Sequence, residues 1–259
     1  MPPDAGLPDP DSAIVARATG PGEPAPDGES VMSLVDHLGE LRNRIIWSVL
    51  AIVAGALVGF LVGDRIISFL KDPLPVSVPL ITLGIGDAFA IRIRIAVVVG
   101  IILGMPVILW NVWRFVAPGL TQAERRAVLP WIPAALIFFG LGVSIAYVVL
   151  PFAATFLLSF QTADLVSMLT AREYFDFVST LFLAFGLLME FPILLVGLSR
   201  VGIVTSDRLR RSRRMIILGI AVFAAAATPG GDLVSPTILG LTLYVLFEGT
   251  VLVIRRSGR

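Results

Sequence analysis

Cysteine is absent from this chain of 259 residues, and histidine occurs only once, as His37. Disulfides and thiolate metal sites are therefore excluded, and a cluster of imidazole ligands cannot form. Charged residues are also scarce, at 15% of the chain, whereas a soluble domain carries about 25%. Hydrophobic residues make up 56% and the mean hydropathy is +0.91. A water-soluble fold of this size could not bury so much apolar surface, so the composition predicts an integral membrane protein.

Residues 1–31 have too few apolar residues to form a core. Up to residue 30 they contain seven prolines, four glycines and six acidic residues, and Arg17 is the one basic residue. We expect a disordered cytoplasmic tail here. A transmembrane domain should follow over residues 32–256, and residues 257–259 should form a short cytoplasmic C-terminal end.

Six apolar stretches are the candidate membrane spans, at residues 45–62, 95–113, 131–150, 177–198, 215–228 and 233–254. Crossing the hydrocarbon takes about 20 helical residues. Only helices satisfy their own backbone hydrogen bonds in lipid, so the fold class is an all-α membrane protein with six transmembrane helices. The fifth stretch has 14 residues, which is short for a span, so either neighbouring helices shield it from lipid or the bilayer thins beside it.

The distribution of basic residues predicts the orientation. If the N-terminus is cytoplasmic, 15 of the 20 basic residues lie in the tail, the inside loops and the C-terminal end. Only five lie in the outside loops, of which we expect the first two at about residues 64–94 and 151–176. The second should begin with an apolar interfacial helix over residues 151–158 that continues past the third span. The positive-inside rule therefore places both termini in the cytoplasm.

Four glutamates stand out in this apolar chain. Glu40 lies in an amphipathic stretch before the first span, and Thr121 and Glu124 have the spacing of a helix capping box. Glu190 lies near the middle of the fourth span, where an unpaired carboxylate is costly and such residues are usually functional. Pro192 should kink the helix beside it. Glu248 lies near the inner boundary, where snorkelling or a link to Arg255 is an adequate structural role.

Two classes of function remain open at this level. A proton-coupled secondary transporter could use Glu190 as its proton site, although the sequence has no internal repeat of the kind many transporters show. An intramembrane hydrolase would need a nucleophile with a base, and Ser144 has no such partner that we can place. No phosphate loop or metal motif is present, so we expect neither an enzyme nor a cofactor. The arginine-rich loop at 200–214 indicates orientation and contact with anionic lipids, not nucleic-acid binding.

Residues 32–256 contain several short motifs in a fixed order, which together resemble those of a known family. They are HLGELR at 37–42, PVILW at 106–110 followed by Trp113, Phe115, Ala117 and Pro118, ERR at 124–126, Ala146-Tyr147 before Pro151, EFP at 190–192, Thr228-Pro229 with Asp232, and LFE at 246–248. This set resembles the TatC family, the polytopic receptor subunit of the twin-arginine protein translocase.

The resemblance implies a receptor that recognises twin-arginine signal peptides and helps to move folded proteins across the cytoplasmic membrane. It implies that Glu40 and Glu124 bind the arginine pair, next to Leu41, Arg42 and Phe115. It also implies a glove-like, concave bundle in a multimeric complex with TatA- and TatB-type single-span subunits, driven by the proton-motive force. The intramembrane polar positions that would meet those partners are Glu190, Thr228, Tyr147 and Glu248.

Overall fold

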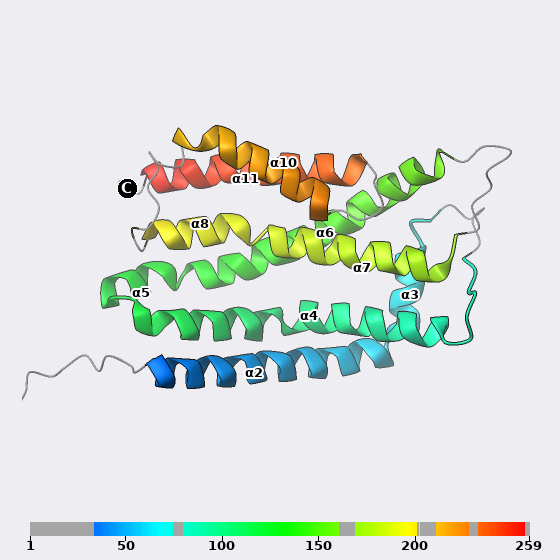
Figure 1. The fold of residues 1–259 in the computed structure, drawn as a ribbon, viewed down its shortest axis with the longest axis horizontal. Coiled ribbons are helices and arrows are strands. Elements are labelled where there is room, and N and C mark those ends of the chain that lie inside the picture. Colours follow the sequence, from blue (N-terminus) through cyan, green and yellow to red (C-terminus); the bar gives the residue numbers. More distant parts are fainter. Residues whose placement is uncertain are drawn as a thin grey trace, which may run out of the picture. The chain divides into compact units, whose positions relative to one another are not determined.

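The computed structural model describes residues 34–74, 80–160, 169–200, 202, 211–227 and 233–256. Within these residues the regular structure is helical, apart from an isolated parallel bridge between Ile81 and Thr170. The helices in chain order (Figure 1) are α2 (Leu34–Leu61), α3 (Gly63–Lys71), α4 (Asp87–Val116), the 3₁₀ turn η1 (Ala117–Gly119), α5 (Gln122–Val128), α6 (Trp131–Leu158), α7 (Ala171–Leu188), α8 (Phe191–Arg200), α10 (Arg213–Ala227) and α11 (Val234–Arg256). The expected tail at 1–31, the end at 257–259 and Thr228 lie outside the described residues.

The chain divides into two compact units, Met1–Glu40 and Leu41–Arg259. The described part of the first unit is the beginning of helix α2, which carries His37 and Glu40. The second unit contains the rest of α2 and all the other described helices.

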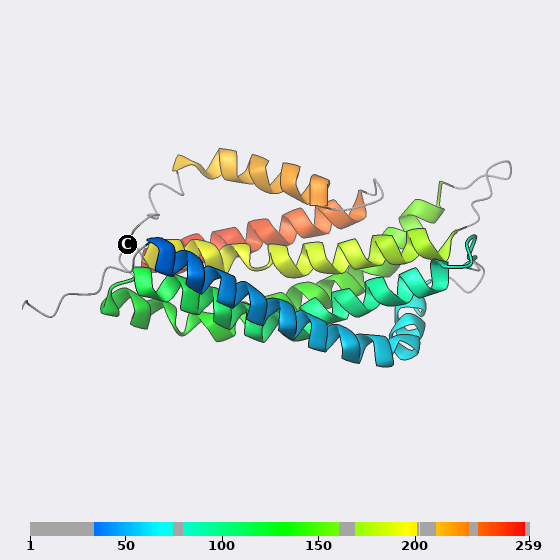
Figure 2. The same ribbon diagram turned by 60° about the horizontal axis from the view of Figure 1, so that its bottom comes forward.

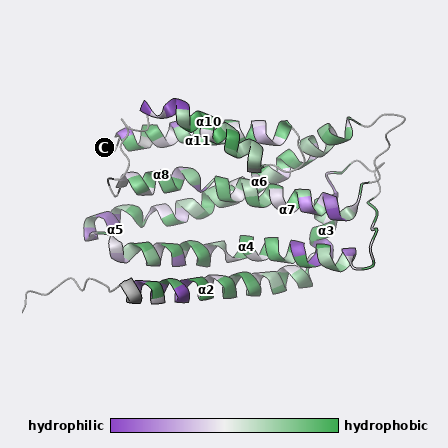
Figure 3. Ribbon diagram, viewed as in Figure 1, coloured by the Kyte–Doolittle hydropathy of each residue, from purple (hydrophilic) through white to green (hydrophobic). Residues whose placement is uncertain are grey.

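Among the described residues, five helical stretches are long and apolar enough to cross a membrane. They are His37–Leu61, Asp87–Gly119, Gln122–Leu158, Ala171–Ser199 and Val234–Leu252. Figure 3 shows hydrophobic residues along the middle of these helices and hydrophilic residues gathered near their ends. An all-helical membrane protein is therefore confirmed. Helix α10 has 15 residues, too few to count among these stretches, so its membrane crossing stays a prediction.

Helices α6 and α7 pack closely at the centre of the second unit. Phe139 and Ala146 of α6, with Leu181 and Phe185 of α7, are almost completely buried. Gly142 allows this approach, because a Cβ at that position would lie 2.4 Å from the carbonyl oxygen of Phe185. Helix α4 packs against both helices, and α10 lies against α11 at the margin of the unit (Figure 2).

Helices α2 and α4 meet through two motifs in which glycines stand four residues apart. Gly55 and Gly59 on α2 approach the part of α4 that contains Gly100 and Gly104. A Cβ on Gly100 would lie 2.4 Å from the carbonyl oxygen of Ile52, and one on Gly55 would lie 3.0 Å from the Cα of Gly100. Lipid provides no hydrophobic drive to bring helices together, so small residues that allow backbone contact stabilise such a pair.

The helix boundaries differ from the sequence expectation at the end of the bundle where α4 begins. Residues 64–94 were expected to be a loop, yet α3 occupies Gly63–Lys71 and α4 begins at Asp87. Helix α7 begins at Ala171 instead of residue 177, whereas the helical continuation expected over residues 151–158 is present, since α6 runs through Pro151 to Leu158. The first turns of α3, α4 and α7 contain charged residues, so the apolar stretches of the sequence begin later than these helices do.

The fourth expected span is interrupted at its polar centre. Helix α7 ends at Leu188 and α8 begins at Phe191, so Met189 and Glu190 form a turn between them. Pro192 lies in the first turn of α8, where its missing N–H costs least. The interruption that the sequence predicts beside Pro192 is therefore present.

Candidate functional site

The loop between α4 and α6 holds Glu124 in a capping box. The backbone N–H of Thr121 donates a hydrogen bond to Oε2 of Glu124 at 2.9 Å, and the hydroxyl of Thr121 donates to the same oxygen at 2.8 Å. In return, the backbone N–H of Glu124 donates to the Thr121 hydroxyl at 3.4 Å. The predicted capping box is confirmed, and it fixes a half-buried carboxylate at the start of α5.

Phe115 and Glu124 lie on consecutive elements of this end of the second unit. Phe115 is half-buried in the last turn of α4, and η1 with Leu120 leads directly from that turn to Thr121. Pro118 within η1 limits the backbone freedom of the connection. The sequence therefore builds a short, stiff link between the aromatic side chain and the carboxylate.

The N-terminal motif forms the beginning of α2. His37 and Glu40 are three residues apart and so share a helical face, and both are half-buried. Leu41 is also half-buried, whereas Arg42 is exposed. The motif is therefore helical, as the spacing predicts, and Arg42 is accessible.

Glu190 borders an apolar cavity of about 440 Å³ between α4, α6 and α8. Its side chain is buried, and its Oε1 has no hydrogen-bond partner among the described residues. Trp113, Trp131 and Leu194 are among the lining residues, and the cavity extends to Leu120, next to the capping box. A buried carboxylate oxygen without a hydrogen bond is unfavourable, so Glu190 is a candidate for contact with a further polar group.

Glu248 on α11 forms an ion pair with Arg213 on α10. Arg213 also donates a hydrogen bond to the hydroxyl of Tyr244 at 3.2 Å. Together Tyr244 and Glu248 raise the pKa of the Arg213 guanidinium. The expectation of snorkelling or a link to Arg255 missed this partner, because Arg213 belongs to a segment 35 residues earlier in the chain.

Tyr147 stacks on Phe69, with ring centroids 4.5 Å apart and planes inclined by 5°. The contact joins α6 to the short helix α3, and Tyr147 is half-buried. Its visible role is therefore packing between these two helices.

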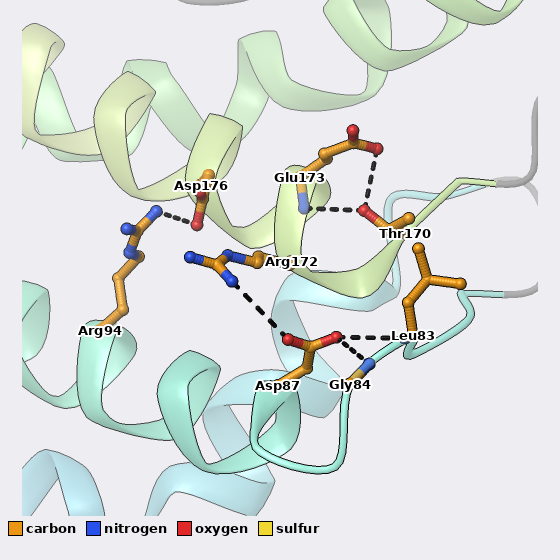
Figure 4. Close-up of polar contacts among 8 residues, drawn as sticks. All are labelled: Leu83, Gly84, Asp87, Arg94, Thr170, Arg172, Glu173 and Asp176. Carbon is orange, nitrogen blue, oxygen red and sulfur yellow. Dashed lines mark hydrogen bonds and ion pairs between the residues drawn. The ribbon is translucent and has the colours of Figure 1, made fainter.

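Ion pairs gather at the end of the bundle where α4 and α7 begin, and sequence reasoning missed them. Asp87 accepts hydrogen bonds from the backbone N–H groups of Leu83 and Gly84 at 3.1 and 2.7 Å, and its other oxygen lies 3.8 Å from Arg172 (Figure 4). Arg94 on α4 forms an ion pair with Asp176 on α7. Arg92 lies 3.2 Å from Asp64. Charges flanking the apolar stretches were visible in the sequence, but their pairing was not.

Within the described residues no group of His, Cys, Asp and Glu side chains could hold a metal ion. Among the polar features described in the second unit, the Glu124 capping box and the Glu190 cavity adjoin through Leu120. An apolar helical bundle with these carboxylates defines a multi-pass membrane protein with two candidate sites for polar groups.

Comparison with known proteins identifies the family. The profile described as "Sec-independent protein translocase protein (TatC)" matches residues 36–241. The TatC protein of Carboxydothermus hydrogenoformans is 35% identical over 86% of this chain and 92% of its own length. That of Deinococcus radiodurans is 36% identical over 95% of this chain and 92% of its own length.

A solved structure agrees with this assignment. The "Twin Arginine Translocase Receptor- TatC" crystallised in the detergent DDM superimposes with a TM-score of 0.74 at 34% identity, over 84% of this chain and 99% of the other. The chain belongs to the TatC family of protein translocase components. It is a subunit of a protein translocase and not an enzyme.

Proposed function

We propose that this chain is the receptor subunit that binds twin-arginine signal peptides, and that Glu40 and Glu124 contact the two arginines. The observation that carries the proposal is the capping box, which holds the Glu124 carboxylate in one orientation at the start of α5. The solved relatives that this chain resembles are titled twin-arginine translocase receptors.

Carboxylates suit this role because of the geometry of arginine. A guanidinium presents five N–H donors in a planar fork that matches a carboxylate, whereas a lysine ammonium is a point charge. A carboxylate offers about four acceptor positions, so Glu124 can serve Thr121 and an incoming guanidinium together. Each charge-assisted hydrogen bond contributes about 1.5–3 kcal/mol.

Residues that neighbour each glutamate in the chain would bind the rest of the signal peptide. Phe115 is half-buried and lies one short turn before the capping box. Leu41 and Arg42 follow Glu40 directly on α2. We propose that these three side chains contact signal-peptide residues that flank the arginine pair.

The same proposal includes six membrane spans with both termini in the cytoplasm. Helix α10 would be the short fifth span, with the bilayer thinned beside it. The excess of basic residues on the side of the N-terminus supports this orientation. The protein would then lie in the cytoplasmic membrane, in contact with its lipids, with a concave face built from several helices.

Glu190 would contact a polar side chain of a single-span TatA- or TatB-type subunit. Its buried Oε1, which has no hydrogen-bond partner among the described residues, supports such a contact. Thr228, Tyr147 and Glu248 would lie along the same partner-binding edge. A multimeric complex of these subunits would move folded cargo by using the proton-motive force.

Site-directed photocrosslinking tests the receptor assignment. A photoreactive residue placed next to the arginine pair of a synthetic signal peptide should label residues 36–44 and 113–126 of the membrane-embedded chain. Labelling should disappear when both arginines are replaced by glutamine. Labelling confined to other segments, or unchanged by loss of the arginines, would contradict the proposal.

A further inference from the structure

The Arg94–Asp176 ion pair borders a groove that lies far along α4 from the Glu124 loop. This open groove of about 660 Å³ runs between α4 and α7. Its lining is apolar apart from Arg94, Ser179 and Thr180, and the apolar members include Phe89, Ile93 and Val97. Arg94 forms the ion pair with Asp176, and their side chains remain 44% and 39% exposed.

The position of this ion pair matches the boundary of the hydrocarbon. Arg94 is the last charged residue before an uncharged run of 19 residues that ends at Trp113. A helical run of that length spans about 29 Å, which is close to the roughly 30 Å of the hydrocarbon layer. The ion pair therefore lies at the depth of lipid headgroups, and the groove below it lies at the depth of acyl chains.

We infer that this groove binds a zwitterionic phospholipid whose headgroup carries a primary ammonium, such as phosphatidylethanolamine. The phosphate would accept hydrogen bonds from Arg94, and the ammonium would donate to Asp176. Arg94 has five N–H donors, and its Nη1 faces Asp176, so its other nitrogens can bind phosphate. The adjacent opposite charges of the headgroup complement the adjacent opposite charges of the pair.

The size of the groove favours a lipid over a partner helix. Binding sites for single small ligands have volumes of about 300–1,000 Å³. A whole membrane-spanning helix, about 30 Å long and 10 Å across, displaces roughly 2,400 Å³. The groove therefore has room for an acyl chain along Ile93 and Val97, whereas it could hold only part of one face of a helix.

Lipid binding to the detergent-solubilised full chain, measured by native mass spectrometry, tests the inference. Dioleoyl phosphatidylethanolamine should bind more tightly than the matching phosphatidylcholine, whose ammonium cannot donate hydrogen bonds, or phosphatidylglycerol, which has no ammonium. Arg94→Gln should weaken phosphatidylethanolamine binding about tenfold, the equivalent of one charge-assisted contact. Asp176→Asn should reverse the preference toward phosphatidylglycerol, because Arg94 would be left without its carboxylate.

Arg65→Gln is the matched control, since Arg65 is an exposed arginine on α3 outside the groove, and it should leave the preference unchanged. Ala90→Trp should reduce binding by filling the groove. Equal binding of the three lipids, or a preference that Arg94→Gln and Asp176→Asn both leave intact, would overturn the inference.

A photocrosslinking residue at Val97 separates a lipid from a protein occupant in native membranes. A lipid adduct is expected. A protein adduct as the main product would show that a partner helix occupies the groove, and would overturn the inference while leaving the receptor proposal untouched.

Discussion

Thr121 and Glu124 each donate a hydrogen bond to the other and each accept one, at the start of α5. Two donors of Thr121 reach one carboxylate oxygen of Glu124 at 2.8 and 2.9 Å. The cap stabilises the helix, and the same contacts hold the carboxylate that we propose for signal-peptide binding. Structural and receptor roles therefore share a side chain, and separating them requires substitutions that remove one role at a time.

Glu124→Gln should remove the charge but keep an oxygen that can accept the bonds from Thr121. Signal-peptide affinity should fall about tenfold or more, with the loss of a charge-assisted contact, while the melting temperature changes little. Thr121→Ala should lower stability by about 1 kcal/mol through loss of the cap, and it should weaken binding less than Glu124→Gln, because the carboxylate remains and keeps the bond from the backbone N–H of residue 121. Peptide-binding titrations and thermal unfolding of the two variants measure both effects. Equal effects of the two substitutions on binding would assign Glu124 to capping alone.

Gly100→Ala should destabilise the protein by about 1–3 kcal/mol, because overpacking a close helix contact forces the backbones apart. The new methyl group would meet the carbonyl oxygen of Ile52 at 2.4 Å. Gly140→Ala on α6 is the matched control, since nothing lies within 4 Å of its Cβ position. That change should be neutral or stabilising, by up to about 1 kcal/mol of helix propensity. Thermal unfolding in detergent compares the two, and equal shifts would show that α2 and α4 are not in close contact.

Arg213→Glu should loosen α10 from α11 by placing two acidic side chains against each other. Amide hydrogen exchange in the first turns of α10 should become faster. The double substitution Arg213→Glu with Glu248→Arg restores opposite charges and should recover most of the protection. If the double variant exchanges as fast as the single one, the ion pair does not hold these helices together.

Much of the helical plan could be predicted from the sequence, because long uncharged stretches and the T-x-x-E spacing are local signals. The stretches within α4, α6 and α11 and the cap at Thr121 are examples. Helix α3 could not be predicted, because its nine residues include Asp64, Arg65 and Lys71 and give no long apolar run. A short helix of this kind depends on packing, here the stacking of Phe69 on Tyr147.

Which charged residues form ion pairs could likewise not be predicted from the sequence. Arg94 and Asp176 are 82 residues apart, and only the packing of α4 on α7 brings them together. The buried state of Glu190 followed from its depth in an apolar stretch, whereas the cavity beside it depends on three separate helices. Local chemistry was therefore predictable, and contacts between distant segments required the fold.

Glu190→Gln tests the role of the intramembrane carboxylate. An uncharged amide keeps hydrogen-bonding capacity and should largely preserve association with single-span partner subunits, whereas Glu190→Leu should abolish it. Copurification of the partners with each variant is the measurement. Glu173→Gln provides a control carboxylate on α7, which accepts a hydrogen bond from Thr170 at the start of its own helix. Uptake of a small solute by the chain alone, lost in Glu190→Gln, would instead support a proton-coupled transporter.

The most direct test of the receptor assignment is the preference for arginine over lysine in the signal peptide. We predict that the unaltered chain binds a twin-arginine peptide at least about tenfold more tightly than its twin-lysine analogue, the equivalent of about 1.4 kcal/mol. The double variant Glu40→Gln with Glu124→Gln should bind both peptides equally and weakly. A double variant that keeps the full preference would contradict the account.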